Sequence, residues 1–341
     1  MRVFAGFDCG GTSTRCMLVS EEGKILGLGK AGPANYLYCG KEMATASIRD
    51  SIRLAWKEAE VKRFATDVSE REIDGMFIAS AAVEVFGGSG HAEFFREVTG
   101  CENVSCDSDI YPVWYGTSKE RFAPAICTIA GTGAVTYLLH DHVFVKASGW
   151  GPQIGDEGAG FDIGLRSLHL TTKMSDGRAS MDKEFYQSVL SHYGLTEKNC
   201  RRLWKAVNGK EEDYRTRVAS VTRVIDSLAS GGNQAAVQMF REAAREVELC
   251  VRSVLRRSAN TDPYDWHDND SGLCFSLVLA GGLFREGSPL TIEVKKLLQD
   301  EPRIISISLP CVPAVQSAAS IALFEAGLRE AAEAVMEASD E

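Results

Sequence analysis

The chain has 341 residues, of which 45% are hydrophobic and 25% are charged, and its formal net charge is −10. This length and composition predict a globular protein of about two domains. The acidic balance leaves no basic stripe to neutralise a phosphate backbone, so we expect no nucleic acid partner. No apolar run approaches the ~18 residues that a membrane span needs, so we also expect no membrane partner.

Ten cysteines are scattered along the chain, and none forms a CxxC pair. Scattered cysteines in mostly apolar contexts predict reduced thiols in an intracellular protein. The N-terminal residues MRVFAGFD read as the start of a strand rather than as a signal peptide. We therefore expect a cytoplasmic protein.

Apolar alternation and turn signals predict the same order of elements twice. In the first half we expect strands at 3–9, 14–20 and 24–31, a helix at 41–61, a strand at 74–80, a helix at 90–99, a strand at 103–106 and a helix at 109–119. In the second half we expect strands at 124–130, 133–139 and 142–148, a helix from 155, a helical insert at 178–230, a helix at 232–259, a strand at 274–280, a helix at 288–299, a strand at 303–308 and a helix at 313–327. Without the insert, both halves read β-β-β-α-β-α-β-α. We expect one domain over 1–117 with 318–341 and a second over 118–317.

Two glycine turns of similar design each join one apolar strand to the next. The first lies in VFAGFDCGGTSTRCMLV and the second in AICTIAGTGAVTYLL. Glycines in such a turn let backbone N–H groups approach an anion closely, so a facing pair would hold a polyphosphate from both sides. Neither turn fits a P-loop or a dinucleotide fingerprint, because a strand follows directly. For either turn alone, an ordinary hairpin is the alternative.

Two aspartates stand at the ends of strands in the first half. Asp8 precedes the first glycine turn, where a carboxylate beside phosphates suits Mg²⁺ bound through water; a turn-initiating Asx role is its alternative. Asp107 ends a strand, where ligands of open α/β sheets bind and where a carboxylate can accept a proton from a hydroxyl. Its alternative is a helix N-cap, although Asp109 suits that position better.

The segment SGWGPQIGDEGAGFDIG combines many glycines with one tryptophan ahead of a predicted helix. The Trp150 ring offers a flat wall for a sugar face. Asp156 is a substrate-binding candidate, with a helix-capping role as the alternative. Asn35, in the loop GPANYL, carries an amide that suits sugar hydroxyls. The glycines of LAGG, at 281 and 282, would let a base or ribose lie against the backbone.

Together, FDCGGTSTR, GPANY, the first Asp of CDSD, AGTG, GWGPQIGDEG and LAGG resemble the N-acetylglucosamine kinase family. This family groups with the BadF/BadG-type ATPases in the actin-like superfamily of sugar kinases, Hsp70 and actin. The resemblance runs nearly end to end. It implies an α/β fold of two ribonuclease-H-like lobes, with a helical insert in the second and with ATP and a sugar in the cleft between them. It also implies ATP-dependent phosphorylation of an amino sugar, N-acetylglucosamine at its 6-hydroxyl, with Mg²⁺. A homodimer is an expectation at the family level.

The resemblance also carries roles to individual residues. Asp107 matches the catalytic base, and it contacts the sugar with Asn35, Gly149, Trp150, Gly151 and Asp156. The phosphate turns are Gly10, Gly11 and Thr12 in the first half and Gly131, Thr132 and Gly133 in the second. Ala229 matches a contact to adenosine, beside Gly281 and Gly282.

Departures from the family pattern leave alternatives open. Cys9, Ala130 and Ala134 stand at the phosphate turns where other residues are usual, and Tyr111 and Trp114 replace small residues after Asp107. A kinase for glucosamine or another hexosamine is one alternative. Another is a BadF-type ATPase that activates a CoA-ester dehydratase or reductase through an iron–sulfur cluster. A nucleotide or sugar sensor without catalysis is a third.

Overall fold

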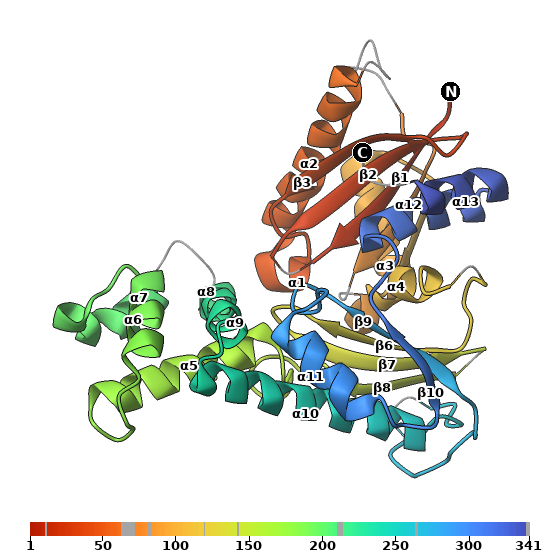
Figure 1. Cartoon of the computed structure of the whole chain (residues 1–341). Coiled ribbons are helices and arrows are strands. Elements are labelled where there is room, and N and C mark those ends of the chain that lie inside the picture. The colour runs from red at the N-terminus through yellow and green to blue at the C-terminus, as the bar shows by residue number, and fades with distance from the viewer. Residues whose placement is uncertain are drawn as a thin grey trace. The chain divides into compact units, whose positions relative to one another are not determined.

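The computed structural model describes residues 1–10, 12–62, 72–80, 83–118, 120–141, 143–209, 214–262 and 265–338. The chain forms two compact units (Figure 1). Unit 1 comprises Met1–Phe122 and Pro310–Glu341, and unit 2 comprises Ala123–Leu309. These changeover points differ from 117/118 and 317/318, the boundaries expected from the sequence.

Unit 1 is a mixed sheet with helices on both faces. Its strands lie in the order β3-β2-β1-β4-β5, in which β2 is antiparallel to both β1 and β3, and β4 is parallel to both β1 and β5. The elements are β1 (Val3–Cys9), β2 (Thr14–Ser20), β3 (Ile25–Ala31), α1 (Tyr36–Cys39), α2 (Lys41–Val61), β4 (Gly75–Ser80), α3 (Val83–Thr99), β5 (Val104–Asp107), α4 (Ile110–Tyr115), α12 (Ala314–Glu325) and α13 (Arg329–Glu337).

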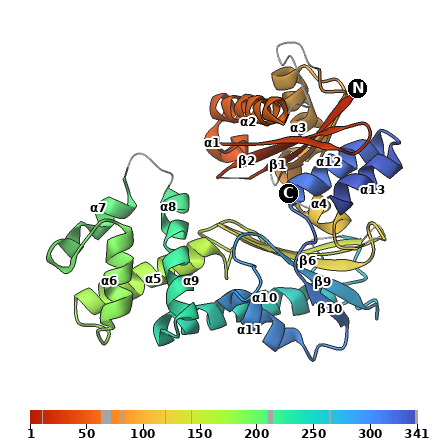
Figure 2. The same ribbon diagram turned by 45° about the horizontal axis from the view of Figure 1, so that its top comes forward.

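Unit 2 repeats this arrangement. Its strand order is β10-β9-β6-β7-β8, which matches the order of unit 1 when it is read from the β8 edge. Helices α10 and α11 lie together along one face of its sheet (Figure 2), and α6 and α7 lie farthest from that sheet. The elements are β6 (Ala125–Ala130), β7 (Ala134–His140), β8 (Val143–Ser148), α5 (Gly160–Ser175), α6 (Lys183–His192), the 3₁₀ helix η1 (Glu197–Arg202), α7 (Leu203–Val207), α8 (Tyr214–Ser220), α9 (Thr222–Ser230), α10 (Gln234–Arg256), β9 (Phe275–Ala280), α11 (Pro289–Leu298) and β10 (Ile304–Ser308). The same strand order in both units confirms the predicted internal repeat.

Helix α12 follows β10 in the chain but packs against the sheet of unit 1. A Cβ on Gly6 of β1 would lie 2.0 Å from the backbone nitrogen of Ala319. The helix therefore touches the strand backbone at this point, and only glycine permits that approach. Alanine-rich α12 provides the matching small surface, and its buried residues join Phe4 and Phe77 in one apolar cluster.

Several predicted element boundaries are wrong. Helix α5 begins at Gly160 instead of 155, because Asp156 and Gly158 adopt left-handed conformations with φ of 57° and 80°. Helix α3 begins at Val83 rather than 90, and its first turns include three glycines, which have low helix propensity. Helix α4 ends at Tyr115, before the predicted 119.

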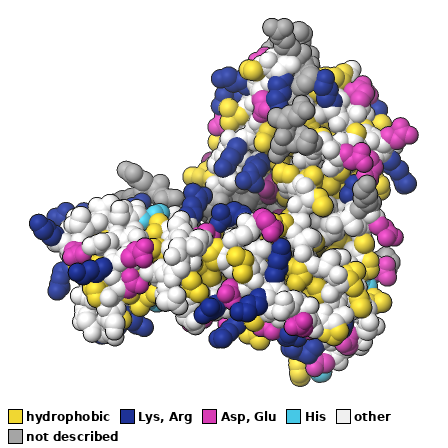
Figure 3. All heavy atoms as spheres, in the orientation of Figure 1, with side chains coloured by type: hydrophobic (Ala, Val, Ile, Leu, Met, Phe, Trp, Pro, Cys, Tyr) yellow, Lys and Arg dark blue, Asp and Glu magenta, His cyan; other side chains and the backbone are white. Residues whose placement is uncertain are grey.

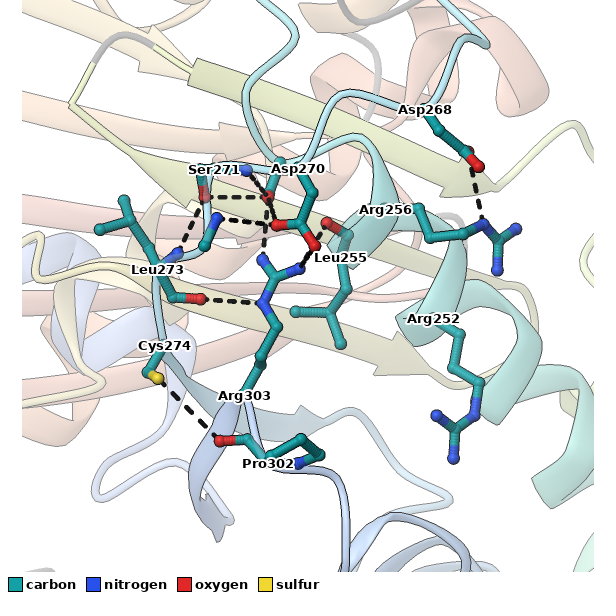
Figure 4. Close-up of polar contacts among 12 residues, drawn as sticks. Arg252, Leu255, Arg256, Asp268, Asp270, Ser271, Leu273, Cys274, Pro302 and Arg303 are labelled. Carbon is teal, nitrogen blue, oxygen red and sulfur yellow. Dashed lines mark hydrogen bonds and ion pairs between the residues drawn. The ribbon is translucent and has the colours of Figure 1, made fainter.

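The Arg303 guanidinium anchors the segment between α10 and β9 (Figure 4). Arg303 donates to the carbonyl oxygens of Leu273 at 3.1 Å and Leu255 at 3.2 Å, and to the Ser258 hydroxyl at 2.9 Å. It also pairs with the Asp270 carboxylate. This one side chain therefore fastens the end of α10 and the following segment to β10.

We expect Arg303→Met to lower the free energy of unfolding by about 2–3 kcal/mol, because it leaves several acceptors without their charged donor. Arg256→Met is the control in the same region, since its partner Asp268 is 3.5 Å away and both side chains are exposed. That change should stay within about 0.5 kcal/mol. Urea denaturation of both variants measures the difference, and equal effects would contradict the anchoring role.

The surface carries both signs of charge. On the face drawn in Figure 3, Lys and Arg side chains are interspersed with Asp and Glu side chains on each unit. Within the described ranges, no helix combines the length and apolarity needed to cross a bilayer.

Candidate active site

In unit 1, two of the predicted site residues lie in one row of the sheet. Asp8 on β1 and Asp107 on β5 are both in register with Ala79 of β4, which lies between them. Side chains in register on parallel strands point to the same face. The row crosses the carboxyl ends of the three strands, so both carboxylates belong to the edge where ligands of such sheets bind.

The Asp107 carboxylate is held at the end of β5. Its Oδ1 accepts a hydrogen bond from the Ser108 N–H at 2.7 Å. Burial raises the pKa of the Asp107 carboxyl above its usual value, and the Ser108 hydrogen bond partly opposes that rise. Asp109 occupies the N-cap position of α4 without a side-chain capping bond. Asp107 is therefore not the N-cap residue of α4.

The raised pKa has a consequence for stability. Below the usual pKa of aspartate, about 3.9, folded and unfolded chains both hold the Asp107 proton. As the pH rises, the unfolded chain loses that proton first, and this side chain then favours unfolding. We expect Asp107→Asn to increase the free energy of unfolding at neutral pH. The gain should shrink as the pH falls toward 3.9, and urea denaturation across that range measures it. A gain that does not change with pH would contradict the assigned cause.

The first glycine turn begins two residues after Asp8. The Asp8 carboxylate lies 3.3 Å from Nη1 of Arg15 on β2, and burial raises its pKa more than Arg15 lowers it. The Gly10 N–H donates to the Ser13 carbonyl at 3.0 Å, and Thr12 is exposed. Gly11 lies outside the described residues.

Asn35 lies between β3 and α1 and is 2% exposed. Its backbone carbonyl oxygen accepts from the Cys39 N–H at 3.2 Å, which closes the single turn of α1. The adjacent Tyr36 ring stacks on His91, with 5.0 Å between ring centroids. The pKa of Tyr36 is raised by burial and by the nearby Cys106 thiol. Tyr36 and Cys106 of β5 both pack against one apolar cluster of unit 1.

In unit 2, the second glycine turn is tied to the start of α5. The Gly131 N–H donates to the Gly133 carbonyl at 2.9 Å, which closes the turn. The Gly160 N–H donates to the Gly131 carbonyl at 2.8 Å, and the Phe161 N–H donates to the Thr132 carbonyl at 3.1 Å. The first amides of the helix thus fix the turn by its carbonyl oxygens.

The loop that carries Trp150, between β8 and α5, folds back onto the second glycine turn through Asp156. The buried Asp156 carboxylate accepts from the Gly151 N–H at 3.1 Å and from Nη2 of Arg215 at 3.2 Å. A Cβ on Gly133 would lie 2.7 Å from Asp156 Oδ2. The N-cap of α5 is Ala159, so the helix-capping alternative for Asp156 is wrong.

Elsewhere in this loop, Trp150 is exposed, and two glycines adopt backbone conformations that other residues rarely adopt. The Trp150 side chain is 67% exposed, as a stacking wall requires. Gly149 and Gly151 have φ of 76° and 100°. Burial raises the pKa of the Asp156 carboxyl, opposed by the Gly151 N–H and by Arg215.

The glycine pair after β9 lies against the second turn. Gly281 has φ of 96°, and a Cβ there would lie 2.4 Å from the carbonyl oxygen of Ala130. That oxygen accepts from the Leu283 N–H at 3.0 Å. A Cβ on Gly282 would meet no atom within 4 Å. Ala229, near the end of α9, is buried in the core of the same unit.

A model of the BadF/BadG/BcrA/BcrD ATPase family matches residues 5–322. The chain belongs to this family. The membership confirms the family predicted from the motifs and agrees with the expectation of an ATP-dependent enzyme.

Two curated relatives of this BadF-family chain are sugar kinases. An N-acetyl-D-glucosamine kinase of Dictyostelium discoideum is 25% identical over 335 residues, which cover 93% of this chain and 96% of the relative. A glucosamine kinase of Vibrio cholerae is 25% identical over 259 residues, covering 76% and 82%. A solved structure of a candidate N-acetylglucosamine kinase from Chromobacterium violaceum superposes with a TM-score of 0.70 at 21% identity, covering 95% of this chain and 99% of that one. The superposition confirms the predicted two-lobed, actin-like α/β fold.

The cysteines of this BadF-family chain bear on the redox alternative. All ten fall within the described residues, and none is paired with another. Cys127, next to the second turn, is completely buried in β6. A buried strand thiol offers no ligand at a subunit surface, so the structure adds no support for a shared cluster.

Sequence reasoning missed two residues at these sites, Glu325 and Arg215, and identified Tyr111 only as a departure from the family pattern. Glu325, at the end of α12, accepts from the Ser105 hydroxyl, and its pKa is raised by burial and by Asp107. The pKa of Tyr111 rises to about 12 through burial, Asp107 and Glu325. Arg215, which pairs with Asp156, comes from the helical insert. No local motif marks Glu325 or Arg215, because each reaches its partner through tertiary packing.

Proposed function

We propose that this protein transfers the γ-phosphoryl group of ATP to the 6-hydroxyl of N-acetylglucosamine. The observation that carries the proposal is the half-buried Asp107 carboxylate at the end of β5, in the same sheet row as Asp8 ahead of the first glycine turn, in a chain of an ATPase family. Curated relatives over most of the chain's length phosphorylate amino sugars by name, which supports this acceptor class.

In this proposal, the two glycine turns hold the phosphates of ATP, with Gly10, Gly11 and Thr12 in unit 1 and Gly131, Thr132 and Gly133 in unit 2. The Gly10 and Gly131 N–H groups already close their turns, so the donors to phosphate are N–H groups later in each turn. Gly281 and Gly282 lie against the nucleoside, with Ala229 nearby. The sugar contacts Asn35, Asp107, Gly149, Trp150, Gly151 and Asp156.

Asp107 acts as the general base. Its carboxylate accepts the proton of the acceptor hydroxyl while the hydroxyl oxygen attacks the γ-phosphorus, and the bond from that phosphorus to the bridging oxygen of ADP breaks. A pKa above the usual aspartate value suits this role, because a base works best when its pKa approaches the working pH. The positioning of both substrates supplies most of the remaining rate enhancement.

The residues present fit Mg²⁺ bound mainly by ATP. Mg²⁺ favours one or two carboxylates, phosphate oxygens and water. Asp8 offers one carboxylate beside the first turn, and its present partner is Arg15. In the described part of the chain, no group of three or more His, Cys, Asp or Glu side chains is arranged to hold a metal. When bound, the ion would offset phosphate charge, with Asp8 reaching it through water.

The acceptor can be tested with a panel of sugars. ADP release is measured with MgATP and N-acetylglucosamine, glucosamine, N-acetylmannosamine, glucose or glycerol. We expect the highest kcat/KM with N-acetylglucosamine. A preference for glucosamine would move the assignment to the alternative hexosamine kinase. No release with any sugar would contradict the kinase proposal.

The second glycine turn provides a separate test of ATP binding. A Cβ on Gly131 would meet no atom within 4 Å in the free protein. We therefore expect Gly131→Ala to leave the free energy of unfolding within about 0.5 kcal/mol of wild type. The methyl group should block the phosphate, so the KM for ATP should rise at least about tenfold, which is 1.4 kcal/mol of binding. Unchanged ATP kinetics in a stable variant would remove this turn from the site.

A further inference from the structure

The helical insert places a guanidinium group at the second glycine turn. A Cβ on Gly133 would lie 2.5 Å from Nη2 of Arg215, which belongs to α8. The same nitrogen lies 3.2 Å from Asp156 Oδ2. One cationic group therefore touches both the turn assigned to phosphate and the carboxylate assigned to the sugar.

Helix packing holds this guanidinium in place. A Cβ on Gly164 of α5 would lie 2.2 Å from the carbonyl oxygen of Val218, so α8 rests directly on α5. The Thr222 hydroxyl, at the start of α9, the helix that follows α8, donates to the Gly160 carbonyl at 2.7 Å. The Gly160 amide in turn holds the second turn at Gly131. The turn, the start of α5 and α8 thus form one connected piece of unit 2.

The charges at this point call for a cation. The turn itself offers only neutral N–H groups, and the buried Asp156 carboxylate beside Gly133 would repel a phosphate. Arg215 offsets that carboxylate, and its side chain keeps 23% of its surface exposed. A guanidinium presents several donors in a planar fork that matches phosphate oxygens.

We propose that Arg215 binds the terminal phosphoryl group of ATP at the second glycine turn and holds Asp156 toward the acceptor sugar. This inference rests on the proposed function and deepens it. It gives the helical insert of unit 2 a residue in the phosphate site. Because ADP lacks the terminal group, the contact favours ATP over ADP.

The test compares the affinities of Arg215→Gln for a non-hydrolysable ATP analogue and for ADP, by calorimetry with Mg²⁺ and without sugar. We expect the dissociation constant for the analogue to rise at least about tenfold, the loss of one charge-assisted hydrogen bond. The constant for ADP should change less than about threefold. Arg215→Lys should keep part of the preference, since it retains the charge.

Two further variants separate this role from a structural one. Arg178→Gln removes an exposed Arg–Asp pair with Asp176, 2.8 Å apart, and should leave both affinities unchanged. Asp156→Asn should raise the KM for sugar while the preference for the ATP analogue persists. If Arg215→Gln changes both nucleotide affinities equally, or only the KM for sugar, the phosphate contact is wrong. Absence of sugar phosphorylation by wild type would instead contradict the proposed function and leave the nucleotide comparison valid.

Discussion

Asp107→Asn is expected to lower kcat for sugar phosphorylation by about 10²–10⁴-fold, the usual contribution of a general base. An asparagine keeps the acceptor oxygen that the Ser108 N–H needs, but it cannot take the proton of the sugar hydroxyl. The KM for ATP should change little, because Asp107 is not assigned to the phosphates. Steady-state ADP release with saturating sugar measures the effect.

Asp109→Asn is the matched control. Asp109 lies two residues further along, at the start of α4, and makes no side-chain capping bond. Its kcat should stay within about threefold of wild type, since this carboxylate touches neither reacting group in the proposal. Similar losses in both variants would contradict Asp107 as the base and point to a general effect of charge at the end of β5.

Gly281→Ala is expected to lower both stability and ATP affinity. The new Cβ would collide with the backbone of Ala130 at 2.4 Å, and φ of 96° is unfavourable for alanine. Strain of this kind costs about 2–4 kcal/mol. Because Ala130 precedes the second turn, relief of the collision would move that turn, and we expect the KM for ATP to rise about tenfold or more.

Gly282→Ala, at the neighbouring position, distinguishes an effect on the free energy of unfolding from an effect on the KM for ATP. A Cβ on Gly282 meets no atom within 4 Å, so the free energy of unfolding should stay within about 0.5 kcal/mol. If Gly282 lies against the nucleoside, only the KM for ATP should rise. A Gly281→Ala variant as stable as Gly282→Ala would contradict the close contact between β9 and β6.

The order of elements could be predicted because each strand carries its own apolar alternation. Residues 3–9 and 14–20 form β1 and β2 with the predicted bounds. The start of α5 could not be predicted, because the left-handed conformation of Asp156 depends on its bonds to Gly151 and Arg215. Propensity describes isolated segments, and here tertiary contacts decide the boundary.

Part of the candidate site could likewise be predicted from local sequence, and part depends on tertiary contacts. Its glycines and aspartates stand in short motifs, so their positions along the strands could be read directly. Glu325 and Arg215 could not be found, since α12 and α8 reach Ser105 and Asp156 only after the chain has folded. The packing of the aromatic residues that depart from the family pattern also could not be predicted. Tyr111 stacks on Phe77, with 5.7 Å between ring centroids.

The proposed phosphorylation of an amino sugar at its 6-hydroxyl can be read from the structure of the product. Phosphorus and carbon NMR of the product from MgATP and carbon-labelled N-acetylglucosamine tests it most directly. We predict one new phosphomonoester whose phosphorus couples to C6 of the sugar, formed with an equal amount of ADP. Coupling to the anomeric carbon, or ATP left unchanged by wild type with this sugar, would contradict the proposed function.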